Sequence, residues 1–181
     1  MAAVGWPKQI CGTVGTVIAL ADWNALSPAE AAQELVVCCA APAWAAALAE
    51  ERPFPAMDGV FDASDRVLSA LDWADLQPAL AAHPRIGERI RRQGAEADWS
   101  RREQAGAQDT DDATARALVE ANEAYEERFG HVFLIFATGK SAGEMLAAAR
   151  ERLRNDEITE QAAVRAELAK ITRLRLERLL T

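Results

Sequence analysis

The chain is organised around HPRIGE, residues 83–88, which hold one of its two histidines. A proline disfavours the helical conformation for the residue before it and has no backbone N–H to donate. The helix-like run from Leu76 to Ala82 is therefore predicted to end at His83. A histidine at a helix end, with charged groups a few residues away, suits a proton-transfer group with a tuned pKa. A helix break with a surface histidine explains the same residues, and the hexapeptide alone favours that simpler interpretation.

The composition predicts an all-α, single-domain bundle of about eight helices. A chain of 181 residues is long enough to bury one core, and half of its residues are hydrophobic although only 6% are aromatic. Alanine, leucine and charged residues dominate, and β-branched residues are few, which favours helices. The net charge of −8 argues against nucleic acid and anionic membranes as partners. This net charge does not exclude a small anionic substrate, because a local cluster of arginines can override the mean charge.

The cysteines indicate a reduced, cytoplasmic protein. Cys11, Cys38 and Cys39 are odd in number, and the last two are adjacent, so neither a disulfide framework nor a metal site is expected. Residues 10–21 form an apolar run that resembles a weak signal peptide but is too short to span a bilayer. We expect residues 1–21 to be an extension outside the core and residues 22–181 to form the domain, with export as the alternative.

Start and stop signals place the helices. Ser27 with Glu30 and Ser141 with Glu144 have the spacing of capping boxes, and Gly130 is typical of a left-handed helix end. The expected helices cover residues 27–40, 43–51, 64–71, 73–82, 110–128, 141–153 and 155–181, with one more beginning at residue 100. Residues 131–137, HVFLIFA, are the most β-like run, but no partner strand is evident. This run is therefore expected to be buried extended chain or a short helix, and His131 is interpreted as a packed or exposed helix-end residue.

Two motifs admit both a structural and a functional interpretation. Residues 138–141, TGKS, resemble the end of a phosphate-binding loop, but Leu134 stands where that motif needs glycine, so nucleotide binding is rejected. Ser100 and Glu103 have capping-box spacing at the start of a helix within the polar, loop-like residues 94–112. The same helix start would offer free amides to an anion, with Glu103 and Gln104 as ligand contacts. The two interpretations are compatible.

An arginine interrupts the apolar face of the last predicted helix. That face is formed by Val164, Leu168, Ile171, Arg175 and Leu179. An unpaired charge there is costly, so Arg175 should pair with an internal glutamate or a bound carboxylate, or extend its head to solvent. Arg173 and Arg178 lie off this line and are interpreted as solvated. We find no Ser/His/Asp or Cys/His nucleophile pattern and no metal-ligand spacing, so no metal site is expected.

Taken in order, the motifs resemble the OHCU decarboxylases of purine catabolism, the ureidoimidazoline decarboxylase family, over roughly residues 23–180. The pieces that carry the resemblance are Asn24-Ala25-Leu26, Cys38-Cys39 with Trp44, Arg52-Pro53-Phe54, residues 83–88, Ser100-Arg101-Arg102-Glu103-Gln104, Asn122 with Tyr125, Arg128-Phe129-Gly130, residues 135–139, Arg152-Leu153-Arg154-Asn155 and Arg175-Leu176. Each piece alone is weakly specific, whereas the ordered set is specific.

The resemblance implies a helical, cofactor-free enzyme, usually a homodimer, that decarboxylates 2-oxo-4-hydroxy-4-carboxy-5-ureidoimidazoline to (S)-allantoin. It implies His83, Glu103 and Arg175 as catalytic residues. The spacing that leads to the arginine near the C-terminus varies, so the position that matches the family's arginine is not set by spacing alone. The substrate-binding residues that it implies are Pro84, Ser100, Gln104, Ile135, Phe136, Ala137, Thr138 and Gly139. The alternative is a non-catalytic helical module that binds a ureide or a partner helix. The two differ in whether His83, Glu103 and Arg175 converge on one pocket.

Overall fold

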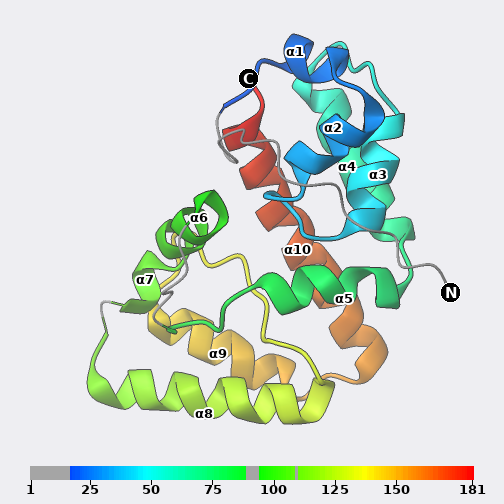
Figure 1. The fold of residues 1–181 in the computed structure, drawn as a ribbon. Coiled ribbons are helices and arrows are strands. Elements are labelled where there is room, and N and C mark those ends of the chain that lie inside the picture. Colours follow the sequence, from blue (N-terminus) through cyan, green and yellow to red (C-terminus); the bar gives the residue numbers. More distant parts are fainter. Residues whose placement is uncertain (1–16, 89–93, 109) are drawn as a thin grey trace, which may run out of the picture.

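The computed structural model describes residues 17–88, 94–108 and 110–181, and within them the fold is all-α (Figure 1). Most of the extension predicted for residues 1–21 lies outside the described residues. The helices are α1 (Leu20–Ala25), α2 (Pro28–Leu35), α3 (Pro42–Glu50), α4 (Met57–Ala70), α5 (Trp73–Ala82), α6 (Ala95–Glu103), α7 (Ala105–Gln108), α8 (Asp112–Phe129), α9 (Ala142–Arg152) and α10 (Glu157–Leu179). These ten described helices exceed the expected number by two. In the described ranges the only β pairing is a single bridge between Ile18 and Leu180, and no helix has the length and apolar character to cross a membrane.

The helices gather in two groups that α5 and α10 connect (Figure 1). Helices α1 to α4 lie together at one end of the molecule, whereas α6 to α9 lie at the other. Each group has its own apolar cluster: the larger one includes Trp23, Trp44 and Leu168, and the smaller one includes Tyr125 and Met145. Helix α10 contributes Val164, Leu168 and Leu179 to the larger cluster, and Arg175 is buried on the same face of the helix.

Most of the predicted helix ends are confirmed. Capping boxes form at Ser27 and Ser141, and Gly130 ends α8 with a φ of 74°. Helix α5 ends at Ala82, and His83 takes an extended conformation with a ψ of 135°, as expected before proline. The prediction that His83 lies at a helix end is therefore confirmed.

Two early helices differ in length from their predictions. Helix α2 ends at Leu35 instead of residue 40, because the N–H groups of Cys38 and Cys39 turn back to the Leu35 carbonyl and both cysteines enter the core. Helix α4 begins at Met57 instead of residue 64. Val60 and Phe61 are buried in its first half, and this tertiary packing outweighs the low helix propensity of Gly59.

The prediction that a helix begins at Ser100 is wrong. Helix α6 begins at Ala95, so Ser100 and Glu103 lie in its second half and the predicted anion-receptive helix start is not at Ser100. The polar residues 94–112, expected to be loop-like, contain both α6 and α7. Acidic Glu96 and Asp98 suit the first turn of α6, and Ala97 and Trp99 give it a buried face.

The β-like segment 133–137 is buried between the two apolar clusters. It forms neither helix nor strand. Phe133, Ile135 and Ala137 join the smaller cluster, whereas Leu134 and Phe136 pack on the larger one. This alternation is the period-two pattern of extended chain. The expectation of buried extended chain is therefore confirmed, and the composition resembles a strand because both faces of the segment are covered.

Replacing Gly106 with alanine is expected to destabilise the protein. A Cβ at Gly106 in α7 would lie 2.1 Å from the carbonyl oxygen of Lys140, so the backbone after residue 138 would have to move. We expect the free energy of unfolding to fall by roughly 1–3 kcal/mol, measured by denaturant unfolding. Gly143→Ala is the matched control, since a Cβ there meets nothing within 4 Å. Equal stability of the two variants would show that this contact is not tight.

Candidate active site

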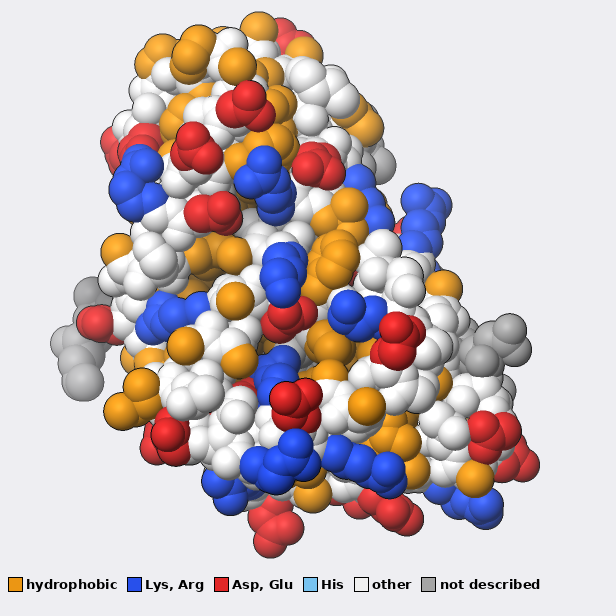
Figure 2. Space-filling view, turned by 180° about the vertical axis from the view of Figure 1, so that it is seen from behind, with side chains coloured by type: hydrophobic (Ala, Val, Ile, Leu, Met, Phe, Trp, Pro, Cys, Tyr) orange, Lys and Arg blue, Asp and Glu red, His pale blue; other side chains and the backbone are white. Residues whose placement is uncertain are grey.

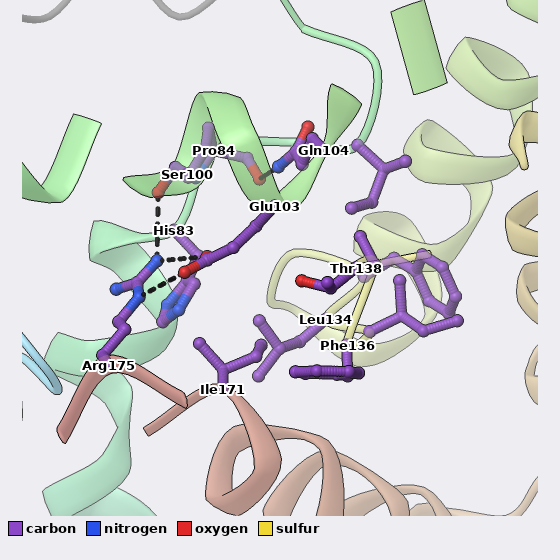
Figure 3. A pocket seen from close by; sticks show the side chains of 14 residues that line it. His83, Pro84, Ser100, Glu103, Gln104, Leu134, Phe136, Thr138, Ile171 and Arg175 are labelled. Atoms are coloured by element: carbon purple, nitrogen blue, oxygen red, sulfur yellow. Dashed lines mark hydrogen bonds and ion pairs between the residues drawn. The ribbon is translucent and has the colours of Figure 1, made fainter. Parts of the chain in front are cut away.

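One pocket lies where the end of α5, helix α6, segment 133–138 and helix α10 meet (Figure 3). Together with the solvent at its mouth, it encloses about 350 Å³. Its lining residues are His83, Pro84, Ile86, Ser100, Glu103, Gln104, Phe133, Leu134, Ile135, Phe136, Ala137, Thr138, Ile171 and Arg175.

The pocket brings together residues that lie far apart in the sequence. Every residue that the sequence analysis singled out for the site is part of the lining except Gly139. Gly139 instead has a φ of 79° in the turn after Thr138, a conformation that glycine adopts most easily. The convergence of His83, Glu103 and Arg175 on one pocket favours an enzyme over a binding module with scattered polar residues.

His83 presents an unpaired ring nitrogen in this pocket. Its Nδ1 lies 2.7 Å from the carbonyl oxygen of Ala79. Because a carbonyl only accepts, Nδ1 carries the proton in the neutral ring, which leaves the lone pair on Nε2. Nε2 is buried and makes no hydrogen bond among the described residues. Burial, and then the positive charge of Arg175, lower the pKa of His83 to about 4. The imidazole is therefore neutral near pH 7 and has a free basic nitrogen.

A buried ion pair faces this imidazole. Arg175 is only 1% exposed. It donates from Nε to Glu103 Oε1 at 3.1 Å, and from Nη2 to Glu103 Oε2 at 2.8 Å and to Ser100 Oγ at 3.0 Å (Figure 3). The acidic partner expected for Arg175 is thus an internal glutamate. This forked geometry fixes both side chains at the wall of the pocket.

A second arginine shares the same carboxylate. Arg178 Nη1 donates to Glu103 Oε1 at 2.9 Å, and the Arg178 side chain is 27% exposed. The interpretation of Arg178 as a solvated residue is therefore wrong. The missed signal was its spacing, because Arg178 follows Arg175 by three residues and so lies next to it on a helix surface.

The Gln104 carboxamide holds the loop after His83. Its Oε1 accepts from the Gly87 N–H at 3.2 Å, and its Nε2 donates to the Pro84 carbonyl at 3.4 Å. Asn122 on α8 adds a bond of 2.9 Å from Nδ2 to the Ile86 carbonyl. These contacts fix residues 84–87 beside the pocket.

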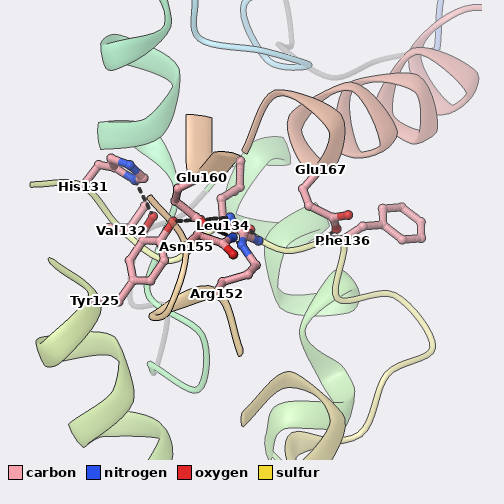
Figure 4. A network of polar contacts seen from close by, with 9 residues as sticks. All are labelled: Tyr125, His131, Val132, Leu134, Phe136, Arg152, Asn155, Glu160 and Glu167. Atoms are coloured by element: carbon pink, nitrogen blue, oxygen red, sulfur yellow. Dashed lines mark hydrogen bonds and ion pairs between the residues drawn. The ribbon is translucent and has the colours of Figure 1, made fainter. Parts of the chain in front are cut away.

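Two charged side chains hold the backbone of the pocket segment 133–137 where a partner strand would otherwise do so (Figure 4). Arg152 Nη1 donates to the Leu134 carbonyl at 2.6 Å, and Glu167 Oε2 accepts from the Phe136 N–H at 2.6 Å. In extended chain, the backbone groups of residues two apart face the same side. The backbone groups of Ile135 and the N–H of Ala137 therefore face away from these contacts. Glu167 was missed in the sequence, although it lies four residues before Ile171 on the helix that carries Arg175.

A buried polar network supports Arg152. Glu160, 1% exposed, accepts from Arg152 Nε at 2.8 Å and from Asn155 Nδ2 at 2.8 Å. The hydroxyl of Tyr125 also donates to Glu160 (Figure 4). Burial, and then the hydrogen bond to Glu160, raise the pKa of Tyr125. The phenol stays protonated, so this network is a support for the pocket segment and not a second acid–base centre.

The two buried cysteines and the second histidine do not line the pocket. Burial raises the pKa of the Cys39 thiol to about 11 and also raises that of Cys38, so neither is a thiolate near neutral pH. His131 packs against the rings of Trp73 and Tyr125, which confirms it as a packed residue. In the described part of the chain no group of His, Cys, Asp and Glu residues is arranged to hold a metal ion.

Comparison with known proteins connects this pocket to one family. The sequence model of OHCU decarboxylase matches residues 24–177. The chain is similar to the uric acid degradation bifunctional protein TTL of Arabidopsis thaliana, with 33% identity over 150 residues, which are 81% of this chain and 46% of the relative. It therefore spans less than half of that longer protein.

Two further matches cover most of both proteins. The 2-oxo-4-hydroxy-4-carboxy-5-ureidoimidazoline decarboxylase of Amia calva is 32% identical over 138 residues, covering 75% of this chain and 79% of the relative. A crystal structure of an OHCU decarboxylase in the presence of (S)-allantoin superposes with a TM-score of 0.70 and 27% identity. That match covers 80% of this chain and 95% of the other.

Proposed function

Because the chain belongs to the OHCU decarboxylase family, we propose that it converts 2-oxo-4-hydroxy-4-carboxy-5-ureidoimidazoline to (S)-allantoin and carbon dioxide in uric acid degradation. The observation that carries this proposal is the pocket itself. It combines a neutral imidazole that has a free nitrogen with a carboxylate and a guanidinium from distant parts of the sequence. Proton transfer and recognition of a small polar anion need these groups.

The reaction needs a place for the electrons of the broken C–C bond and a group that delivers protons. The substrate carries a carboxylate and a hydroxyl on one ring carbon, and the adjacent ring carbon is doubly bonded to nitrogen. When carbon dioxide leaves, the electrons of the broken C–C bond form a C=C bond to that neighbour, and the imine nitrogen takes a proton. The hydroxyl then loses its proton as a carbonyl forms, and the neighbouring carbon gains one. In total, one proton is consumed and one carbon dioxide is released.

His83 is the group proposed to move these protons. A neutral Nε2 can accept the hydroxyl proton of the substrate, and the resulting imidazolium can return a proton to the ring carbon. The hydrogen bond from Nδ1 to Ala79 keeps the ring in the tautomer that this role requires. Delivery from one fixed side of the ring would give a single enantiomer of the product.

The remaining pocket residues are proposed to hold the substrate. Arg175 would bind the carboxylate or the ureido group through a forked hydrogen bond. Glu103 and Gln104 would pair with the N–H and C=O groups of the ring and ureido arm, with Ser100 beside them. The backbone of residues 135–139 and the ring of Pro84 would complete the binding surface. These contacts would decide which face of the ring receives the proton.

The pH profile is expected to identify His83 as a base. The pKa of His83 is lowered to about 4, and the neutral, active form exists above this value. We therefore expect kcat/KM to be flat from about pH 5 to 8 and to fall by about tenfold per pH unit below pH 4. Circular dichroism at each pH would check that the protein remains folded. A rate that instead falls as the pH rises above 4 would show that the imidazolium is the required form.

The proposed activity can be tested by generating the unstable substrate in place. Urate oxidase and hydroxyisourate hydrolase would convert urate to the ureidoimidazoline, and circular dichroism would follow its conversion to allantoin. The active protein should produce (S)-allantoin well above the spontaneous rate, whereas without it the product should be racemic. Racemic product at the spontaneous rate in the presence of the protein would refute the proposal.

The family resemblance also supports a cofactor-free, cytoplasmic homodimer with residues 22–181 as its domain. Size-exclusion chromatography with light scattering would test the dimer directly. Dialysis against a chelator with no loss of activity would test the independence from metal ions.

A further inference from the structure

The carboxylate of Glu103 is shared between two guanidinium groups. Oε1 accepts from Arg175 Nε at 3.1 Å and from Arg178 Nη1 at 2.9 Å, whereas Oε2 accepts from Arg175 Nη2 at 2.8 Å. Arg175 lines the pocket, but Arg178 does not. Arg178 therefore acts on the pocket through Glu103, from a position one helical turn further along α10.

The charges around the pocket explain why a second arginine matters. Arg175 and Glu103 carry opposite charges that cancel, and His83 is neutral near pH 7 because its pKa is lowered to about 4. These three groups alone would offer a ligand carboxylate no net attraction. A carboxylate placed there would also lie close to the carboxylate of Glu103, and like charges in a poorly solvated site repel strongly.

We infer that Arg178 is a positioning residue that gives this site a net charge of +1 and so makes the pocket selective for a ligand that carries one carboxylate. It holds Glu103 from the side away from the pocket. Arg175 can then turn donors toward a ligand without leaving Glu103 unpaired. Nη1 of Arg175 makes no hydrogen bond in the described part of the chain, so it is the donor that a ligand can take first.

The inference concerns the substrate class of the proposed decarboxylase and rests on that function only for its kinetic test. Two stable probes separate charge from shape. Allantoate is a ureido carboxylate with one negative charge, whereas allantoin is the neutral cyclic ureide. Isothermal titration calorimetry would measure both dissociation constants for the unmodified protein, Arg178→Gln and Arg178→Lys, and the coupled assay would give kcat and KM.

The control is Arg173→Gln, which removes the same charge from the same helix. Arg173 is 46% exposed and lies 3.9 Å from Asp65 and 4.0 Å from Glu177, outside the pocket. It corrects for the change in net charge of the whole protein.

Arg178→Gln is expected to weaken allantoate binding and to raise KM by about tenfold each, while kcat and the affinity for allantoin change by less than about threefold. Arg178→Lys should restore most of the loss, because it keeps the charge. Added sodium chloride should reduce the difference between the unmodified protein and Arg178→Gln, since Arg178 is partly exposed.

Equal weakening of allantoate and allantoin would overturn the inference, since it would show that Arg178 only supports the shape of the pocket. The inference would also be overturned if Arg173→Gln weakened allantoate binding as much as Arg178→Gln does, or if the unmodified protein did not bind allantoate more tightly than allantoin. A protein that shows the selective loss of allantoate binding but no turnover would uphold the charge inference and refute the proposed decarboxylase.

Discussion

Replacing His83 with alanine is expected to lower kcat by about a hundred- to ten-thousandfold, the usual contribution of a positioned acid–base group. The substitution removes the only pocket nitrogen that combines a free lone pair with burial in the described residues. The fold should persist, because the single hydrogen bond that the His83 side chain makes, to the Ala79 carbonyl, lies at the end of α5, and the backbone N–H of His83 still donates to the Leu80 carbonyl in the variant. The measurement is the rate of (S)-allantoin formation in the coupled assay.

The second histidine provides the matched control for this experiment. His131 lies outside the pocket lining and packs against aromatic rings, so His131→Gln should change stability more than kcat. If His83→Ala formed chiral allantoin at the unmodified rate, His83 would be a structural residue. The proposed proton transfer would then have to be assigned to another group.

Replacing Glu103 with glutamine is expected to cost about 3–5 kcal/mol of folding free energy, because it leaves a buried guanidinium without its counter-ion. Arg175 is 1% exposed and donates two of its three hydrogen bonds to this carboxylate. For a chain of this size, such a loss corresponds to a fall in Tm of about 10 °C. Differential scanning calorimetry would measure it, and activity should fall as well, since Glu103 is proposed to contact the substrate.

A surface ion pair of the same type gives the comparison. Arg85 donates from Nε and Nη2 to both oxygens of Glu126 at 2.7 Å, but its side chain is 49% exposed. Glu126→Gln should therefore lower the free energy of unfolding far less than Glu103→Gln does. If the two variants lost similar amounts of unfolding free energy, burial would not be what makes the Glu103 pair strong.

The sequence predicted the parts of the site that follow from local rules. Pro84 forces His83 out of the helical conformation, so a helix end at that histidine could be predicted without any tertiary information. The need for an acidic partner at Arg175 could also be predicted locally, because a charge on an apolar helix face needs a partner. Its partner could not be identified, since Glu103 lies 72 residues away and only the fold brings the two together.

The predictions for Ser100 and Arg178 were wrong because the sequence pattern behind each of them is compatible with two structures. Ser100 and Glu103 have the spacing of a capping box, yet the same spacing places both residues on one side of a helix that begins five residues earlier. Arg178 lies off the apolar line through Arg175, and an arginine off that line is expected to be solvated. The three-residue spacing from Arg175 places the two arginines side by side on α10, but the contact of Arg178 with Glu103 also depends on how α10 packs against α6, which the sequence of α10 alone does not give.

The pairing between residues 18–20 and the end of α10 limits how the protein can be shortened. The Ile18 N–H donates to Leu179 and the Leu20 N–H donates to Thr181, while Ile18 accepts from the N–H of Thr181. A truncated protein that starts at Asp22 would lose all three bonds, and α10 would fray from its last turn backward. Fraying would reach Arg178 before Arg175, so the balance of charge at the pocket would change before its shape does. Shortened variants and affinity tags should therefore leave this pairing intact.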